Sequence, residues 1–193
     1  MRSVAVTGHR PSKIGWGYDY SEPHWVRLKE RFKSFLLSEK VTDAFSGMAL
    51  GVDQVFAIAV IELKKAGCDI KLHAVIPCNN QCCKWTRESQ ELYYKLLGYA
   101  DEIIGMSEYN ETGYVNLTLT SNNDLVLIES DSGYVYQQQY KPYLLQKRNI
   151  YMVDNTYDIL AVWNGSDGGT ANCVKYAISL GSRNIIRIDP LTV

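Results

Sequence analysis

Three short stretches of the sequence combine glycines with polar side chains, and each follows a run of apolar residues: positions 7–11, 46–54 and 164–170. A glycine-rich turn that leads into a helix presents backbone N–H groups without partners at the positive end of the helix dipole. Such a turn is suited to binding an anion such as phosphate. The alternative is a tight strand–helix corner whose glycines only allow the backbone to turn.

The side chains within these stretches add groups that a nucleotide-like ligand would use. Ser46 offers a hydroxyl, and Asp53 and Gln54 offer groups able to bond a ribose or a base. Arg10 can bind a phosphate through two parallel hydrogen bonds, and His9 can donate a hydrogen bond or titrate near neutral pH. The alternative for His9 and Arg10 is a structural hydrogen bond to nearby carbonyl groups.

A second candidate phosphate cradle precedes the last predicted helix, at positions 168–170, and a basic triplet occupies positions 147–149. The triplet could face a phosphate or could lie on a solvated helix face. The full set of predicted ligand-binding residues is Gly8, His9, Arg10, Ser46, Gly47, Gly51, Asp53, Gln54, Arg148, Asn164, Gly165, Gly168, Gly169 and Thr170. Five aromatic residues near predicted loops or strand ends are candidates for stacking on a base or for ordinary packing: Trp16, Tyr18, Trp85, Tyr109 and Trp163.

Other kinds of site find little support in the sequence. It contains neither a GxGxxG run nor a GxxxxGK[ST] run. Cys78, Cys82 and Cys83 lack the second spaced pair of ligands that a structural zinc site shows, and Cys173 is predicted to be a small buried helix residue. We therefore predict neither a metal site nor a cofactor, and we assign no catalytic residue.

These stretches are positioned by alternating strand and helix patterns. Strands are predicted at 3–6, 41–45, 70–76, 101–106, 157–163 and 184–188, and helices at 21–37, 55–63, 86–99, 143–154 and before Gly181. Ser21 and Thr86 are predicted helix N-caps, positions 7–18 a loop, and Ile178 part of an apolar helix stripe. The alternation predicts one α/β domain over 1–193, with a mostly parallel, Rossmann-like sheet covered by helices on both faces. All three polar stretches should then meet at the carboxyl edge of the sheet.

Residues 110–139 interrupt this alternation. Two runs with strand character, 114–120 and 124–129, and a third at 134–136 are separated by turn-forming residues. The segment is too long for an ordinary connection, so we predict a β-meander inserted in the domain. We interpret this segment first as an arm that packs against the domain or against another copy of the chain, and in the second case the protein would be a homo-oligomer. The alternative interpretation is a lid over a site.

The length, charge and composition of the chain limit which classes of molecule we expect it to bind. A length of 193 residues suits a single domain, and a net charge of −1 gives no basic field for nucleic acid or an anionic membrane. No apolar run is long enough to span a membrane, and the first residues read as a strand rather than a signal peptide. The odd count of five cysteines argues against a disulfide framework. We expect a cytoplasmic protein with a small-molecule ligand and no membrane partner.

Several motifs together resemble the YpsA-like family of the SLOG superfamily, which also contains the DprA/Smf DNA-processing proteins and the LOG hydrolases. They are Thr-Gly-His-Arg-Pro at 7–11, Ser-Gly-Met-Ala-Leu-Gly-Val-Asp at 46–53, Ile-Pro-Cys at 76–78, Lys-Arg-Asn with Met-Val-Asp at 147–154, and Trp-Asn-Gly with Gly-Gly-Thr at 163–170. The resemblance covers nearly the whole chain except 110–139. It implies a Rossmann-like fold that binds a nucleotide or nucleotide-derived ligand.

The resemblance leaves three functions open. The first is binding, sensing or sequestering an ADP-ribose-like molecule, in a bacterial or phage protein. The second is N-glycoside hydrolysis of nucleoside monophosphates, as in the LOG branch. That branch places a glutamate shortly after the Gly-Gly-Thr turn, whereas here Ala171, Asn172 and Cys173 follow Thr170. The third is a DprA-like partner in nucleic-acid processing, against which the net charge of −1 argues.

Overall fold

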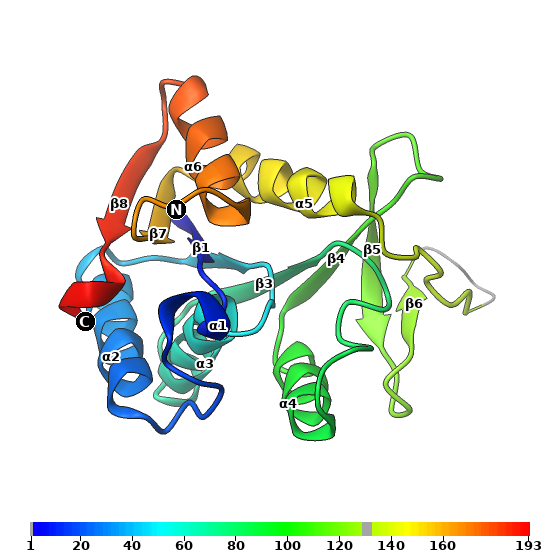
Figure 1. Cartoon of the computed structure of the whole chain (residues 1–193). Coiled ribbons are helices and arrows are strands. Elements are labelled where there is room, and N and C mark those ends of the chain that lie inside the picture. The colour runs from blue at the N-terminus through cyan, green and yellow to red at the C-terminus, as the bar shows by residue number, and fades with distance from the viewer. Residues whose placement is uncertain (1, 129–132) are drawn as a thin grey trace.

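A computed structural model of the chain describes residues 2–128 and 133–193, and its centre is an eight-stranded sheet in the order β6-β5-β4-β3-β2-β1-β7-β8 (Figure 1). The strands are β1 Ser3–Gly8, β2 Asp43–Ser46, β3 Lys71–Ile76, β4 Glu102–Met106, β5 Tyr114–Leu119, β6 Leu125–Leu127, β7 Asp158–Val162 and β8 Asn184–Ile188. The helices are α1 Pro11–Ile14, α2 Pro23–Ser38, α3 Val52–Lys65, α4 Arg87–Leu97, α5 Pro142–Asp154 and α6 Gly169–Ser179, with a final 3₁₀ turn at Pro190–Thr192.

Strands β4, β3, β2, β1, β7 and β8 run parallel to one another, whereas β5 pairs antiparallel with β4, and β6 pairs antiparallel with β5. Helices α2, α3 and α4 lie on one face of the sheet, and α5 and α6 lie on the other (Figure 1). The predicted fold class, a mostly parallel Rossmann-like sheet with helices on both faces, is confirmed. Among the described residues, no helix is long and apolar enough to cross a membrane.

The alternating side chains of the strands form two cores. Val4 and Val6 of β1 pack in the larger core with Trp25 of α2 and Phe56 of α3, whereas Ala5 packs in the smaller core under α5 and α6. Since successive side chains of a strand point to opposite faces, a strand with both faces covered must be apolar throughout. This explains the short uninterrupted apolar runs that predicted the strands.

Strand β1 lies where the order of the chain reverses. The strands β2, β3 and β4 extend from one side of β1, and β7 and β8, which come later in the chain, extend from the other side. Loops that leave the carboxyl ends of β1 and β7 therefore diverge to opposite faces of the sheet. In open α/β sheets, this divergence leaves a crevice in which ligands bind.

Several local predictions are wrong. Residues 11–14 form the short helix α1 rather than part of a loop, with Pro11 in its first turn and Gly15 in the left-handed region at φ 75° after its end. Ser21 is not an N-cap: α2 begins after Glu22, and the Ser21 hydroxyl instead donates to Asp19 Oδ1 at 2.7 Å. Ile178 is 61% exposed and so lies outside the buried stripe of α6.

Other boundaries agree with the sequence or shift by a few residues. Thr86 caps α4, accepting a hydrogen bond from the Ser89 backbone N–H at 3.3 Å. Helix α3 begins at Val52 rather than at 55, because the chain turns sharply at Gly51, where φ is 93°. This earlier start places Asp53 and Gln54 in the first helical turn.

The inserted β-meander extends the main sheet. Strand β5 pairs antiparallel with β4, β6 pairs with β5, and Val135 forms a bridge with Val126. The predicted strand 124–129 is thus shortened to Leu125–Leu127, and the part of the meander at 129–132 lies outside the described residues. A role of this segment in forming oligomers stays a prediction.

The close approach of β1 to α3 gives a test of the packing. A Cβ atom added to Gly8 would lie 2.5 Å from Cβ of Val52, whose short, branched side chain cannot swing away. We predict that Gly8→Ala lowers the free energy of unfolding by about 1–3 kcal/mol in urea titrations. The matched control is Gly98→Ala, because its Cβ would come no closer than 3.5 Å to the Lys95 carbonyl oxygen and its backbone is helical. Equal stability of the two variants would contradict this account of the β1–α3 contact.

Candidate functional site

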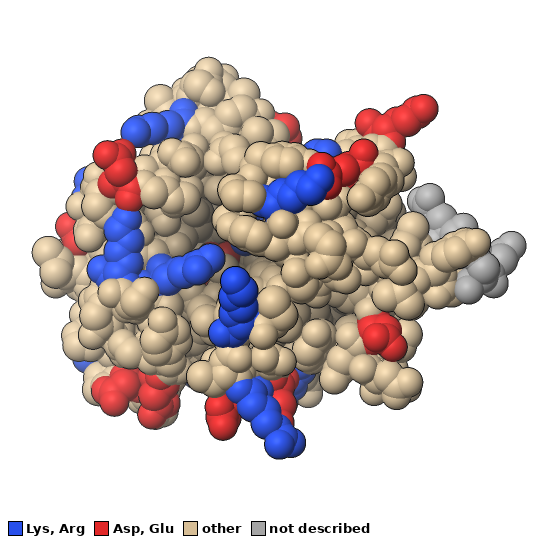
Figure 2. Space-filling model, turned by 45° about the vertical axis from the view of Figure 1, so that its right-hand side comes forward, with Lys and Arg blue, Asp and Glu red and all other residues tan. Residues whose placement is uncertain are grey.

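A cavity of about 380 Å³ lies at the carboxyl ends of the central strands. Its walls come from the end of β1 with α1, the loop and first turn after β2, the loop after β3, α5, and the start of α6. Figure 2 shows basic side chains gathered around a hollow on this side of the molecule. The residues that line it are Thr7, Gly8, His9, Arg10, Ser12, Lys13, Ala49, Asp53, Pro77, Cys78, Gln81, Trp85, Tyr140, Leu145, Arg148, Asn149, Gly169 and Thr170.

His9 connects two of the three predicted stretches. Its Nε2 lies 2.8 Å from Oδ1 of Asn164, and its Nδ1 lies 3.5 Å from Oγ1 of Thr170. Asn164 Oδ1 also accepts hydrogen bonds from the backbone N–H and the hydroxyl of Ser166. That network assigns Nε2 as the protonated nitrogen of a neutral imidazole and leaves Nδ1 as an acceptor.

Burial keeps this imidazole neutral. His9 is 3% exposed, and burial lowers the pKa of its side chain below the ordinary value of 6.5, with Lys13 contributing in the same direction. The hydrogen bond to Asn164 opposes this shift without reversing it. At neutral pH, His9 therefore acts as a hydrogen-bonding group rather than as a cation.

Asp53, Arg148 and the Gly47 carbonyl form a second cluster. Arg148 donates from Nη1 to the Gly47 oxygen at 2.9 Å, and the same Nη1 lies 3.8 Å from Oδ2 of Asp53. Asp53 also accepts a hydrogen bond from the Ala49 backbone N–H at 3.3 Å. Burial raises the pKa of the Asp53 carboxyl, whereas Arg148, the Ala49 N–H and Arg10 act in the opposite direction. Arg148, from the basic triplet 147–149, thus holds the loop after β2 in place.

Three residues of the stretch 46–54 form hydrogen bonds outside the cavity. Ser46 donates from its hydroxyl to the Asp53 carbonyl at 2.8 Å, and Gln54 accepts a hydrogen bond from the Tyr20 hydroxyl at 2.8 Å. The Gly51 backbone N–H donates to the same hydroxyl at 2.7 Å. Ser46, Gln54 and Gly51 do not line the cavity. In this structure they position the loop and the start of α3.

Two further basic residues line the cavity, and one of them, Lys13, lies beside the start of α6. Arg10 is exposed at the N-terminal end of α1, and Lys13 of α1 donates from Nζ to the Asp167 carbonyl on the opposite loop. Gly168 precedes α6 with φ 138°, and within the described chain no side chain caps that helix. The start of α6, Lys13 beside it and Arg10 therefore line the same cavity.

Half of the predicted set lines the cavity and half does not. Seven of the predicted residues line it, namely Gly8, His9, Arg10, Asp53, Arg148, Gly169 and Thr170. The remaining seven stand behind or beside these: Ser46, Gly47, Gly51, Gln54, Asn164, Gly165 and Gly168. Sequence reasoning missed Lys13, Gln81 and Tyr140. The proline and glycine that bound α1 were a signal for the helix that carries Lys13.

The aromatic candidates divide in the same way. Trp85 lines the cavity, together with Tyr140, which the sequence did not single out. Trp16 instead packs against Trp25, with ring centroids 4.8 Å apart, and Trp163 donates from Nε1 to the Ser166 carbonyl at 2.7 Å. Cys78 and Cys82 are buried, Cys83 is exposed, and no cluster of potential metal ligands occurs among the residues that the structure describes.

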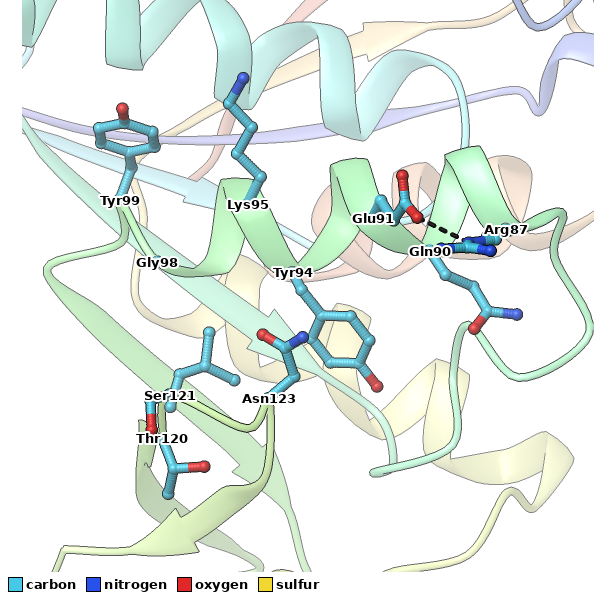
Figure 3. A pocket seen from close by; sticks show the side chains of 11 residues that line it. Arg87, Gln90, Glu91, Tyr94, Lys95, Gly98, Tyr99, Thr120, Ser121 and Asn123 are labelled. Atoms are coloured by element: carbon cyan, nitrogen blue, oxygen red, sulfur yellow. Dashed lines mark hydrogen bonds and ion pairs between the residues drawn. The ribbon is translucent and has the colours of Figure 1, made fainter.

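A second concavity, of about 620 Å³, lies between α4 and the β5–β6 turn. Figure 3 shows the Tyr94 ring of α4 beside Asn123 of that turn, whereas the Lys95 and Tyr99 side chains point away from it. Arg87 and Glu91 form an ion pair along the helix at 2.9 Å. None of the predicted ligand-binding residues lines this surface.

The buried imidazole predicts a pH dependence of stability. The unfolded chain takes up a proton at this residue near pH 6.5, whereas the folded protein does so only at lower pH. The contribution of neutral His9 is therefore complete above about pH 6.5 and is lost as the pH falls through the folded-state pKa. We predict that the free energy of unfolding, measured in urea between pH 7.5 and 5, falls less steeply with acid in His9→Gln than in the unaltered protein. His24→Gln, at an exposed histidine, is the control. Identical slopes for His9→Gln and the unaltered protein would refute the assignment.

Comparison with known proteins places this geometry in a family. The YpsA family model, described as a SLOG family, matches residues 4–134. The SPbeta prophage-derived protein YoqJ of Bacillus subtilis is 30% identical over 159 residues, which cover 80% of this chain and 82% of YoqJ. A UPF0398 protein of Brevibacillus brevis is 27% identical over 164 residues, which cover 81% of this chain and 85% of that protein.

The solved structure of DNA processing protein A (DprA) from Streptococcus pneumoniae has a similar fold. It superposes with a TM-score of 0.60 at 13% identity over 97% of this chain and 50% of the DprA chain, so this chain spans half of that protein. At this identity the similarity shows the fold alone. The match of the family model and the identity to YoqJ show that the chain belongs to the YpsA family of SLOG proteins.

Proposed function

We propose that the cavity at the carboxyl ends of β1, β2 and β7 binds a phosphate-bearing, nucleotide-derived ligand such as an ADP-ribose-like molecule, and that the protein senses or sequesters it. The observation that carries this proposal is that Arg10, Lys13 and the uncapped start of α6 line the same cavity. A helix N-terminus and charged donors together favour a phosphate group. Membership of a SLOG family supports the same class of ligand.

The other walls of the cavity suit the rest of such a ligand. Asp53 and Asn149 offer polar groups to a ribose, and Nδ1 of the neutral imidazole of His9 can accept a hydrogen bond. The volume of about 380 Å³ is within the range of small-molecule sites. Gly8, Gly169 and Thr170 bring backbone groups to the same surface.

A panel of nucleotides tests the proposal. We predict that at least one of AMP, ADP-ribose, cyclic ADP-ribose and NAD raises the thermal unfolding midpoint. At about 100 times its dissociation constant, a ligand adds roughly 2.7 kcal/mol, which for a chain of this size corresponds to about 5–10 °C. Arg10→Ala should weaken the binding of that ligand about 10- to 100-fold, because it removes a charge-assisted hydrogen bond.

The control for Arg10→Ala is Arg87→Ala. Arg87 is an exposed arginine of α4 that lies outside the cavity, so its removal changes the net charge equally. We expect its ligand-induced shift to match that of the unaltered protein. No shift with any of the four nucleotides, or equal losses in both variants, would overturn the proposal.

A second candidate function is hydrolysis of an N-glycosidic bond, and the position of Asp53 favours it. Asp53 is the carboxylate that the described part of the chain contributes to the cavity wall, and burial raises its pKa above the ordinary value. In this reaction a water oxygen would bond to C1′ of the ribose as the bond to the base breaks, and a proton would pass to the departing base. The structure places Asn172, and no carboxylate, in the first turn of α6 after Thr170.

Chromatography of nucleoside monophosphates incubated with the protein separates the two functions. Hydrolysis predicts release of free base and ribose 5-phosphate, and Asp53→Asn should abolish this release while the substrate still raises the unfolding midpoint. Binding without release in the unaltered protein would eliminate hydrolysis and leave the binding proposal in place.

A further inference from the structure

The end of the cavity farthest from the start of α6 is aromatic. Trp85, in the loop after β3, and Tyr140, in the segment before α5, both line it. Trp85 packs T-shaped against buried Tyr93, with ring centroids 5.4 Å apart, so its indole is held in place by the core. The Tyr140 side chain is 51% exposed. The fixed ring of Trp85 and the accessible ring of Tyr140 therefore border the same end of the cavity.

The distance between the two ends of the cavity limits which ligands can reach both of them. The strands β3 and β7 are three interstrand spacings apart in the sheet, or about 14 Å. The cavity wall includes Pro77 and Cys78 beyond β3 as well as Gly169 and Thr170 beyond β7. A sugar phosphate held at α6 is too short to reach the aromatic end, whereas a nucleotide carries a base beyond its sugar in that direction.

Gln81 adds an unsatisfied acceptor to the aromatic end. It lines the cavity, and its Nε2 donates to the Gly47 carbonyl at 3.1 Å, which fixes the orientation of the amide. Its Oε1 is buried and has no hydrogen-bond partner among the residues that the structure describes. A buried acceptor without a partner is costly, and a donor brought by a ligand would remove that cost.

The segment 136–141, which we call the strap, brings Tyr140 to this position. It leads from the β-meander to α5, and it is bonded to the loop after β3. The Asn79 backbone N–H donates to the Gln138 carbonyl at 3.0 Å, and the Tyr140 backbone N–H donates to Oδ1 of Asn80 at 3.0 Å. The backbone of Tyr140 is thus fixed although its ring is accessible.

We infer that Trp85 and Tyr140 form a subsite that stacks on the base of the bound nucleotide, and that Gln81 selects a base with an exocyclic amino group, as in adenine. This inference rests on the proposed function and specifies its ligand class. Stacking on aromatic side chains supplies affinity for any base, whereas the carbonyl of Gln81 can accept a hydrogen bond only from a donor. The meander and strap therefore contribute to the choice of ligand.

Calorimetric titration with AMP, IMP and ribose 5-phosphate tests the subsite. IMP carries a carbonyl where AMP carries its amino group, and ribose 5-phosphate lacks the base. We expect AMP to bind more tightly than IMP, and both more tightly than ribose 5-phosphate. Tyr140→Ala should weaken AMP and IMP about 5- to 100-fold and leave ribose 5-phosphate unchanged. Tyr140→Phe, which keeps the ring, should bind all three like the unaltered protein.

Gln81→Ala tests selection separately from stacking. It should remove the preference for AMP over IMP while both continue to bind more tightly than ribose 5-phosphate. The inference is overturned if Tyr140→Ala leaves AMP binding unchanged or weakens ribose 5-phosphate equally, or if the preference survives Gln81→Ala. Binding of ribose 5-phosphate as tight as that of AMP would overturn the subsite but retain the phosphate site. Absence of binding by all three compounds would overturn the subsite. If, in addition, none of the four nucleotides of the thermal panel raises the unfolding midpoint, the proposed function is overturned as well.

Discussion

The hydrogen bond from Arg148 to the Gly47 carbonyl, at 2.9 Å, joins the two helical layers of the molecule at the cavity. It links α5 on one face of the sheet to the loop that leads into α3 on the other. A Cβ atom at Gly47 would lie 2.4 Å from the Nη1 atom that donates this bond and 2.7 Å from Oδ2 of Asp53, so the arrangement requires glycine there. The Arg148 guanidinium also faces the buried carboxylate of Asp53, and separating these two groups would leave each charge uncompensated. The loop after β2, the first turn of α3 and α5 are therefore constrained together.

The sequence predicted the strands and loops that carry the site better than it predicted the side chains that line the cavity. The parallel strands are short apolar runs, and their order along the chain was enough to place the three glycine-rich stretches at one sheet edge. The side chains that face the cavity depend on finer features. Helix α1 has only four residues, too few to show periodicity, so Lys13 was assigned to a loop. Tyr140 reaches the cavity through the hydrogen bond of its backbone to Asn80, a pairing across 60 residues that no local pattern encodes.

The β-meander illustrates the same limit. Its period-two pattern predicted strands but could not indicate their partner. Strand β5 pairs with β4 through residues such as Val115 and Leu117, so the meander covers what would otherwise be an open parallel edge. Its return segment is then held against the loop after β3 by Asn79 and Asn80. An insertion that completes a sheet edge thereby also forms part of the cavity wall.

The cations of the cavity are not equivalent, although the chain as a whole carries a net charge of −1. Arg148 directs hydrogen bonds to Gly47 and, from Nε and Nη2, to Oδ1 of Asn149, and its charge faces buried Asp53. Its charge is thus largely compensated within the protein. Arg10 is exposed, and Lys13 bonds to a neutral carbonyl beside the start of α6, so their positive charges remain available to a ligand in the cavity. Since an anion is bound by uncompensated charge, in the proposed complex the phosphate contacts α1 and α6, and Arg148 holds the walls in place.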